Sequence, residues 1–123
     1  MLFSRPTAKV LIAESNDALR SFLSETLEWL GCEVVQSSDG AQARSLFEKD
    51  SDSVHLVILR SELPILNGVE LLKAIRQRHP TKPILFMKES LDEEIIGLDA
   101  ACEVLAKPFS KLEFTSAVRR CLT

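Results

Sequence analysis

Five short apolar runs recur along the chain, and each is nearly continuous instead of alternating with polar residues. They occupy residues 10–13, 34–35, 54–59, 84–87 and 104–106. Runs of this length without alternation are typical of strands buried on both faces, as in a parallel sheet. The pattern therefore predicts five interior strands.

Segments with helical periodicity separate these runs. The first has apolar residues spaced along one helix face, namely Leu19, Phe22, Leu23, Leu27 and Leu30. Asn16 or Asp17 suits the start of this helix. The later helices also have start signals, in the pairs Asp39 and Gln42, Asn67 and Glu70, Ser90 and Glu93, and Ser110 and Glu113. The last two pairs match the capping box, in which a serine and a glutamate satisfy the first turn reciprocally.

Strand and helix thus alternate five times, with no linker, repeat or low-complexity stretch between them. Right-handed crossovers between such units give one open parallel sheet with helices on both faces. We expect a single (βα)5 flavodoxin-like α/β domain over residues 1–123. The strand order 2-1-3-4-5 is favoured because the first and third runs are the most hydrophobic and belong in the middle.

Length and charge narrow the possible functions. The chain has 123 residues, a net charge of −3 and a pI of about 5.4. Binding to nucleic acid or to an anionic membrane needs a basic surface, so we expect neither. No apolar run approaches the roughly 20 residues of a membrane span, and residues 1–7 lack a secretory apolar region, so we expect a cytoplasmic protein. The cysteines 32, 102 and 121 lack metal-site spacing and are expected to be free thiols.

Charged residues follow the apolar runs where a sheet of this type binds ligands, at the carboxyl ends of its central strands. Glu14 and Ser15 follow the first run, and Arg60 ends the third. Lys88 and Lys107 follow the fourth and fifth runs. The predicted site therefore holds one carboxylate against three cations.

Five stretches of sequence carry a resemblance to a known family. They are VLIAE at 10–14, DGAQA at 39–43, LPILNGVELL at 63–72, PILFM at 83–87 and LAKPF at 105–109. In this order and at these intervals, they make residues 9–123 resemble the receiver domain of two-component response regulators. The resemblance implies the CheY-like fold and a cis peptide bond between Lys107 and Pro108.

Phosphotransfer in that family needs an aspartate at the end of the third strand, an acidic pair for Mg²⁺, a hydroxyl after the fourth strand and a lysine after the fifth. In this chain the corresponding residues are Arg60 as acceptor, Glu14 and Ser15 as the acidic pair, Lys88 for the hydroxyl, and Lys107, which keeps its type. The aromatic switch position on the fifth strand is occupied by Val104.

These departures have chemical consequences. Arginine carries no nucleophilic oxygen and stays protonated, so Arg60 cannot form an acyl phosphate. Mg²⁺ prefers octahedral oxygen donors such as carboxylates. Two like unit charges about 4 Å apart near a protein surface repel each other by roughly 4 kcal/mol, and a divalent ion beside three cations would meet that repulsion several times over. We therefore expect that Mg²⁺ binding is lost, that no other cofactor is used, and that the chain is not an enzyme.

Two interpretations of Arg60 remain open. Its guanidinium could form a structural salt bridge with Glu14 in the space that metal and phosphate would otherwise occupy. Alternatively, Arg60, Lys88 and Lys107 could bind phosphate, sulfate or a partner's carboxylate. The second interpretation makes the domain an anion sensor.

The leading hypothesis for function is a pseudo-receiver that signals by protein contact and independently of phosphorylation. The resemblance implies that a protein partner, or a second copy in a homodimer, docks on the face formed by the fourth helix, the fifth strand and the fifth helix. Here that face comprises Glu93, Glu94, Gly97, Val104, Lys111, Phe114 and Arg119. We expect no DNA-binding output within residues 1–123, because the receiver-like fold takes up all of them.

The alternative is a working phosphorelay receiver with a non-standard acceptor. Ser61 and Glu62 follow Arg60 directly, and Asp39 ends the second strand. Strand alternation directs Ser61 away from Arg60, Glu62 has entered the loop, and Asp39 lacks a metal-binding partner. An independent enzyme has no support, because the sequence offers no matched acid–base pair.

Overall fold

The computed structural model describes residues 7–123 and contains a five-stranded sheet. Its strands are β1 (Lys9–Ala13), β2 (Glu33–Ser37), β3 (Leu56–Arg60), β4 (Ile84–Lys88) and β5 (Cys102–Ala106). All neighbouring strands are parallel and their order is β2-β1-β3-β4-β5. The predicted order is confirmed, and the strands with continuous burial lie in the middle, as expected of a sheet covered on both faces.

Within the described part of the chain, four helices pack on this sheet, namely α1 (Asp17–Trp29), α2 (Gly40–Asp50), α3 (Gly68–Arg78) and α4 (Lys111–Leu122). Each begins after a polar cap whose side chain accepts a hydrogen bond from a backbone N–H in the first turn; the caps are Asn16, Asp39, Asn67 and Ser110. Ser110 and Glu113 form the predicted reciprocal capping box. These side chains satisfy N–H groups that have no partner within the helix.

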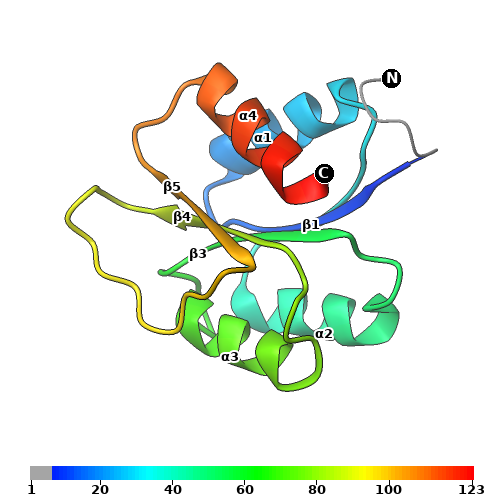
Figure 1. Ribbon diagram of the computed structural model, residues 1–123, viewed down its shortest axis with the longest axis vertical. Coiled ribbons are helices and arrows are strands. Elements are labelled where there is room, and N and C mark those ends of the chain that lie inside the picture. The colour runs from blue at the N-terminus through cyan, green and yellow to red at the C-terminus, as the bar shows by residue number, and fades with distance from the viewer. Residues whose placement is uncertain (1–6) are drawn as a thin grey trace.

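The helices form two layers. Figure 1 shows α1 and α4 on one face of the sheet and α2 and α3 on the other. Leu23 and Leu27 of α1 meet Phe114 of α4 in one core cluster, while Phe47 of α2 and Leu71 of α3 lie in the second. No helix within residues 7–123 is long and apolar enough to cross a membrane. Residues 1–6, on which the leader prediction and the first domain boundary partly rest, lie outside the described part.

The fourth predicted helix, which should begin near Ser90, is absent from residues 89–101. Residues 89–101, the crossover between β4 and β5, form turns and irregular backbone. The prediction of a helix after every strand is therefore wrong at this one connection. The carboxylate of Glu93, expected to cap Ser90, instead accepts hydrogen bonds from the Glu89 N–H at 2.7 Å and from the Ser61 hydroxyl. Gly97, with φ of 97°, then takes a left-handed conformation that interrupts helical geometry.

The apolar stripe of α1 is also narrower than predicted. Leu23, Leu27 and Leu30 are fully buried, but Phe22 at the margin of the stripe is 41% exposed. A helix that lies on a sheet can bury only part of its circumference against that sheet. Phe22 therefore lies at the solvent boundary of α1, outside the core.

Candidate functional site

The sheet brings several charged residues together at its carboxyl edge. Glu14 follows β1, Arg60 ends β3, Glu89 follows β4 and Lys107 follows β5. Parallel strands end at the same edge, which explains how residues far apart in sequence become neighbours. The predicted proximity of Glu14, Arg60 and Lys107 is present in the structure.

Glu14 and Arg60 form the centre of this cluster. Arg60 Nη1 donates to Glu14 Oε2 at 2.9 Å, and the backbone N–H of Asn16 donates to the same oxygen at 2.9 Å. The Glu14 side chain is 0% exposed and that of Arg60 is 13% exposed. Burying a carboxylate away from water costs free energy, and hydrogen bonds and ion pairs with its neighbours offset that cost.

Glu89 is the member of the cluster that sequence reasoning missed. Its carboxylate contacts Arg60 Nη2, and Lys107 Nζ lies 3.6 Å from Glu89 Oε1 and 3.6 Å from Glu14 Oε1. The four side chains carry two negative and two positive charges, so the cluster is formally neutral. The only sequence signal was that Glu89 directly follows Lys88, one residue beyond the strand end.

Lys88 does not join the cluster, and the predicted balance of one carboxylate against three cations is wrong. Lys88 Nζ donates to the backbone carbonyl of Leu91 at 3.1 Å, within the crossover. Side chains alternate between the two faces of a strand, and a one-residue offset therefore decides which neighbour turns toward the cluster. At this strand end the carboxylate of Glu89, and not the ammonium of Lys88, faces Arg60.

The surroundings keep Arg60 charged. Desolvation by burial acts to lower its pKa, but the hydrogen bond that Arg60 donates to Glu14 and the charges of Glu14, Glu89 and Glu62 outweigh it and raise the pKa above the ordinary value. A guanidinium without burial is already protonated throughout the usual pH range. Arg60 is therefore a permanent cation in this site.

A second contact attaches the crossover to β3. The Ser61 hydroxyl donates to Glu93 Oε2. Burial acts to raise the pKa of Glu93, but the hydrogen bonds from Ser61 and from the Glu89 N–H, with the charges of Lys88 and Arg60, lower it. Ser61 and Arg60, consecutive in sequence, thus each hold one acidic residue of the segment that follows β4.

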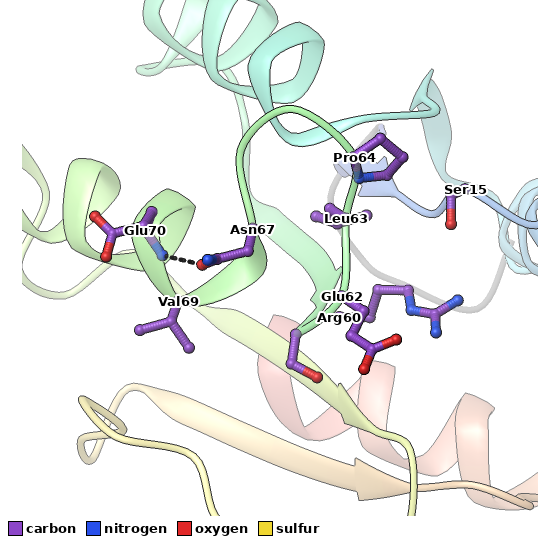
Figure 2. A pocket seen from close by; sticks show the side chains of 9 residues that line it. Ser15, Arg60, Glu62, Leu63, Pro64, Asn67, Val69 and Glu70 are labelled. Atoms are coloured by element: carbon purple, nitrogen blue, oxygen red, sulfur yellow. Dashed lines mark hydrogen bonds between the residues drawn. The ribbon is translucent and has the colours of Figure 1, made fainter.

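A cleft with a volume of about 720 Å³ opens beside Arg60. Figure 2 shows Ser15 and the Arg60 guanidinium on one side of the β3–α3 loop, with Val69 and Glu70 on the other. Glu62 also lines the cleft and is exposed. Ser15 therefore reaches the same cleft as Arg60, although no hydrogen bond joins their side chains among those of residues 7–123.

Asp39 and Lys107–Pro108 also have defined places in the structure. Asp39 uses its carboxylate to cap α2, accepting from the Gln42 N–H at 2.7 Å. The Lys107–Pro108 peptide bond is cis, as the resemblance implied. Within residues 7–123, no group of three or more His, Cys, Asp or Glu side chains lies close enough to hold a metal ion.

The predicted docking face is altered by the missing helix. Val104 lies opposite Phe86 in the register of β5 and β4, and is 38% exposed because no helix covers it. Phe114 is 0% exposed within the core, so its assignment to a surface is wrong. Glu93 turns inward to Ser61, whereas Glu94, Gly97, Lys111 and Arg119 remain exposed.

A family model described as the response regulator receiver domain matches residues 10–119. Over 116 residues the chain is 34% identical to the transcriptional regulatory protein CpxR of Escherichia coli K12, covering 93% of this chain and 49% of that protein. Over 117 residues it is 31% identical to the alkaline phosphatase synthesis transcriptional regulatory protein PhoP of Bacillus subtilis, covering 93% and 48%. The chain thus spans about half the length of these curated relatives.

Solved structures agree with the fold. The chemotaxis response regulator CheY4 of Vibrio cholerae superposes with a TM-score of 0.84 at 27% identity, over 94% of this chain and 99% of that one. A response regulator receiver domain protein from Clostridium thermocellum gives a TM-score of 0.84 at 23% identity, with 94% of each chain covered, and supports the fold alone.

Proposed function

The chain belongs to the response regulator receiver domain family, and we propose that it serves two-component signalling as a receiver-like module that acts by protein contact without accepting phosphate. The family consists of signalling domains that work through protein partners. In this proposal, the chain differs from the rest of the family in that it does not accept phosphate.

One observation carries the proposal: β3 ends on Arg60, and its guanidinium lies between the carboxylates of Glu14 and Glu89. The acceptor position of the family therefore holds a group with no nucleophilic oxygen. Its contacts with Glu14 and Glu89 also place the guanidinium beside Glu14, where a phosphoryl group would sit.

The side chains at the strand ends do not fit Mg²⁺. The ion needs several oxygen donors in octahedral geometry, but Glu14 Oε2 already accepts two hydrogen bonds and Glu14 Oε1 faces Lys107. A divalent cation there would also lie next to Arg60 and Lys107 and be repelled by both. The proposed module therefore works without Mg²⁺.

Signalling in this proposal passes through the crossover, β5 and α4. The exposed residues of that face are Glu94, Gly97, Val104, Lys111 and Arg119. They combine an apolar strand residue with charges of both signs, a composition suited to a protein partner or to a second copy of the chain. With Lys88 and Val104 at the switch positions, any change of state has to come from another bias, such as partner or anion binding.

The decisive experiment is incubation with acetyl phosphate and Mg²⁺ followed by intact-mass analysis. We expect no phosphate adduct under conditions in which a receiver with an aspartate at the end of its third strand is modified in parallel. A stoichiometric adduct would reject the proposal.

A second candidate, a receiver with a non-standard acceptor, draws on the position of Glu62. This carboxylate is exposed, lines the cleft and lies within electrostatic reach of Arg60. Peptide mapping of any adduct distinguishes the two cases, because this candidate requires phosphate on Glu62 and its disappearance in Glu62→Gln. The hydroxyl of Ser61 is already used on Glu93, and the carboxylate of Asp39 on the cap of α2.

A further inference from the structure

The loop between β3 and α3 displays an isoleucine in a left-handed backbone conformation. Ile65 has φ of 70° and is the only non-glycine residue with positive φ within residues 7–123. A β-branched side chain strongly disfavours this region, where glycine or asparagine is usual. The side chain is nevertheless 83% exposed, so packing inside the domain does not compensate for the strain.

Contacts on both sides of Ile65 impose its conformation. The Pro64 carbonyl accepts hydrogen bonds from the N–H of Gly40 at 3.1 Å and of Leu66 at 2.7 Å. A Cβ atom added to Gly40 would lie 1.6 Å from the Leu66 carbonyl oxygen, so the loop rests directly on the start of α2. Strain persists where the surroundings over-determine the backbone in this way. Ile65 is therefore held outward on a rigid turn.

The cleft beside this loop is acidic at its surface. Two exposed carboxylates, Glu62 and Glu70, line it together with the apolar side chains of Pro64 and Val69. The charge of Arg60, which also lines it, is already compensated by carboxylates behind the cleft. Among the ion pairs of residues 7–123, the one that Lys73 forms is with Glu70, at 3.5 Å.

We propose that the loop at residues 61–67 and this cleft are a docking surface for a segment of another protein that carries basic side chains beside an apolar one. Ile65 supplies a preformed apolar contact, which costs little conformational entropy to use because the turn is already rigid. Glu62 and Glu70 take the basic side chains. This surface is separate from the crossover, β5 and α4, and it does not depend on whether the domain accepts phosphate.

The test uses a phage-displayed library of random peptides selected on the wild-type protein. We expect the enriched peptides to combine arginine or lysine with an apolar residue. Their binding should weaken about tenfold in Ile65→Gly, the loss typical of one central contact, and also fall in Glu62→Gln. Leu112→Ala, which truncates another highly exposed apolar side chain, on α4, is the matched control and should bind as the wild type does.

Amide chemical shifts of the protein locate the bound peptide, and shifts confined to residues 61–70 support the proposal. Glycine favours the conformation of residue 65, so Ile65→Gly should remain folded, and Ile65→Asn provides a second variant that tolerates positive φ. The proposal is rejected if no peptide is enriched, if the enriched peptides are acidic, if Ile65→Gly binds them as tightly as the wild type, or if the shifts map elsewhere.

Discussion

Glu89 reaches back from the end of β4 to contact the guanidinium of Arg60 at the end of β3. Because Lys88 also turns away, this contact leaves a neutral cluster where the sequence predicted an excess of positive charge. It also joins the crossover, which lacks its helix, to the centre of the sheet. The same interaction therefore contributes to the charge balance of the site and, with the contact between Ser61 and Glu93, attaches the crossover to β3.

Replacing Arg60 by methionine should destabilise the domain by about 3 kcal/mol, because the fully buried Glu14 would lose its main partner. Urea denaturation measures the loss. The double variant Arg60→Met, Glu14→Leu should recover most of it, since no buried charge then remains unpaired. A loss below about 0.5 kcal/mol in the single variant would mean that water reaches Glu14 and that the pair is unimportant.

Sulfate or phosphate at millimolar concentration should leave the melting temperature of the wild type unchanged, because carboxylates already neutralise Arg60 and Lys107. In Glu89→Gln one of those carboxylates becomes neutral, and an anion can take its place. We expect a sulfate-dependent rise in melting temperature in that variant. A rise of equal size in the wild type would instead favour the anion-sensor interpretation.

The stability contributed by Glu93 should depend on acidity. Its pKa is lower in the folded protein than the ordinary glutamate value, so its contribution is present above about pH 4.3. It is lost as the pH falls from there through the folded pKa. The difference in unfolding free energy between wild type and Glu93→Gln should therefore shrink between pH 7 and pH 3. A difference that stays constant would show that the carboxylate charge is not what holds Ser61.

Ile65→Gly should stabilise the domain by roughly 1 kcal/mol, because glycine removes the strain of a left-handed β-branched residue and the side chain lost is exposed. Thermal unfolding should show an increase of about 4 °C. Ile65→Ala is the control, since alanine keeps the Cβ atom and should gain much less. Equal gains in both variants would mean that the backbone of residue 65 is not strained.

Much of the fold was determined by the sequence alone. Continuous apolar runs predicted the five parallel strands, and cap residues such as Asn67 and Ser110 predicted where helices begin. The hydrophobicity of the central runs also predicted the strand order. Helix starts depend on neighbouring residues, and strands and their order depend on burial. The pattern of polar and apolar residues along the chain indicates each of these.

The tertiary structure alone decided which groups face one another. The pair Ser90 and Glu93 looks like a helix start, yet Ser61, distant in sequence, takes the carboxylate of Glu93. The sequence predicted Lys88 for the site, yet it is the neighbouring Glu89, just past the end of β4, whose side chain turns toward Arg60. A contact between distant residues is fixed by side-chain direction and packing, which the order of residues along the chain does not encode locally.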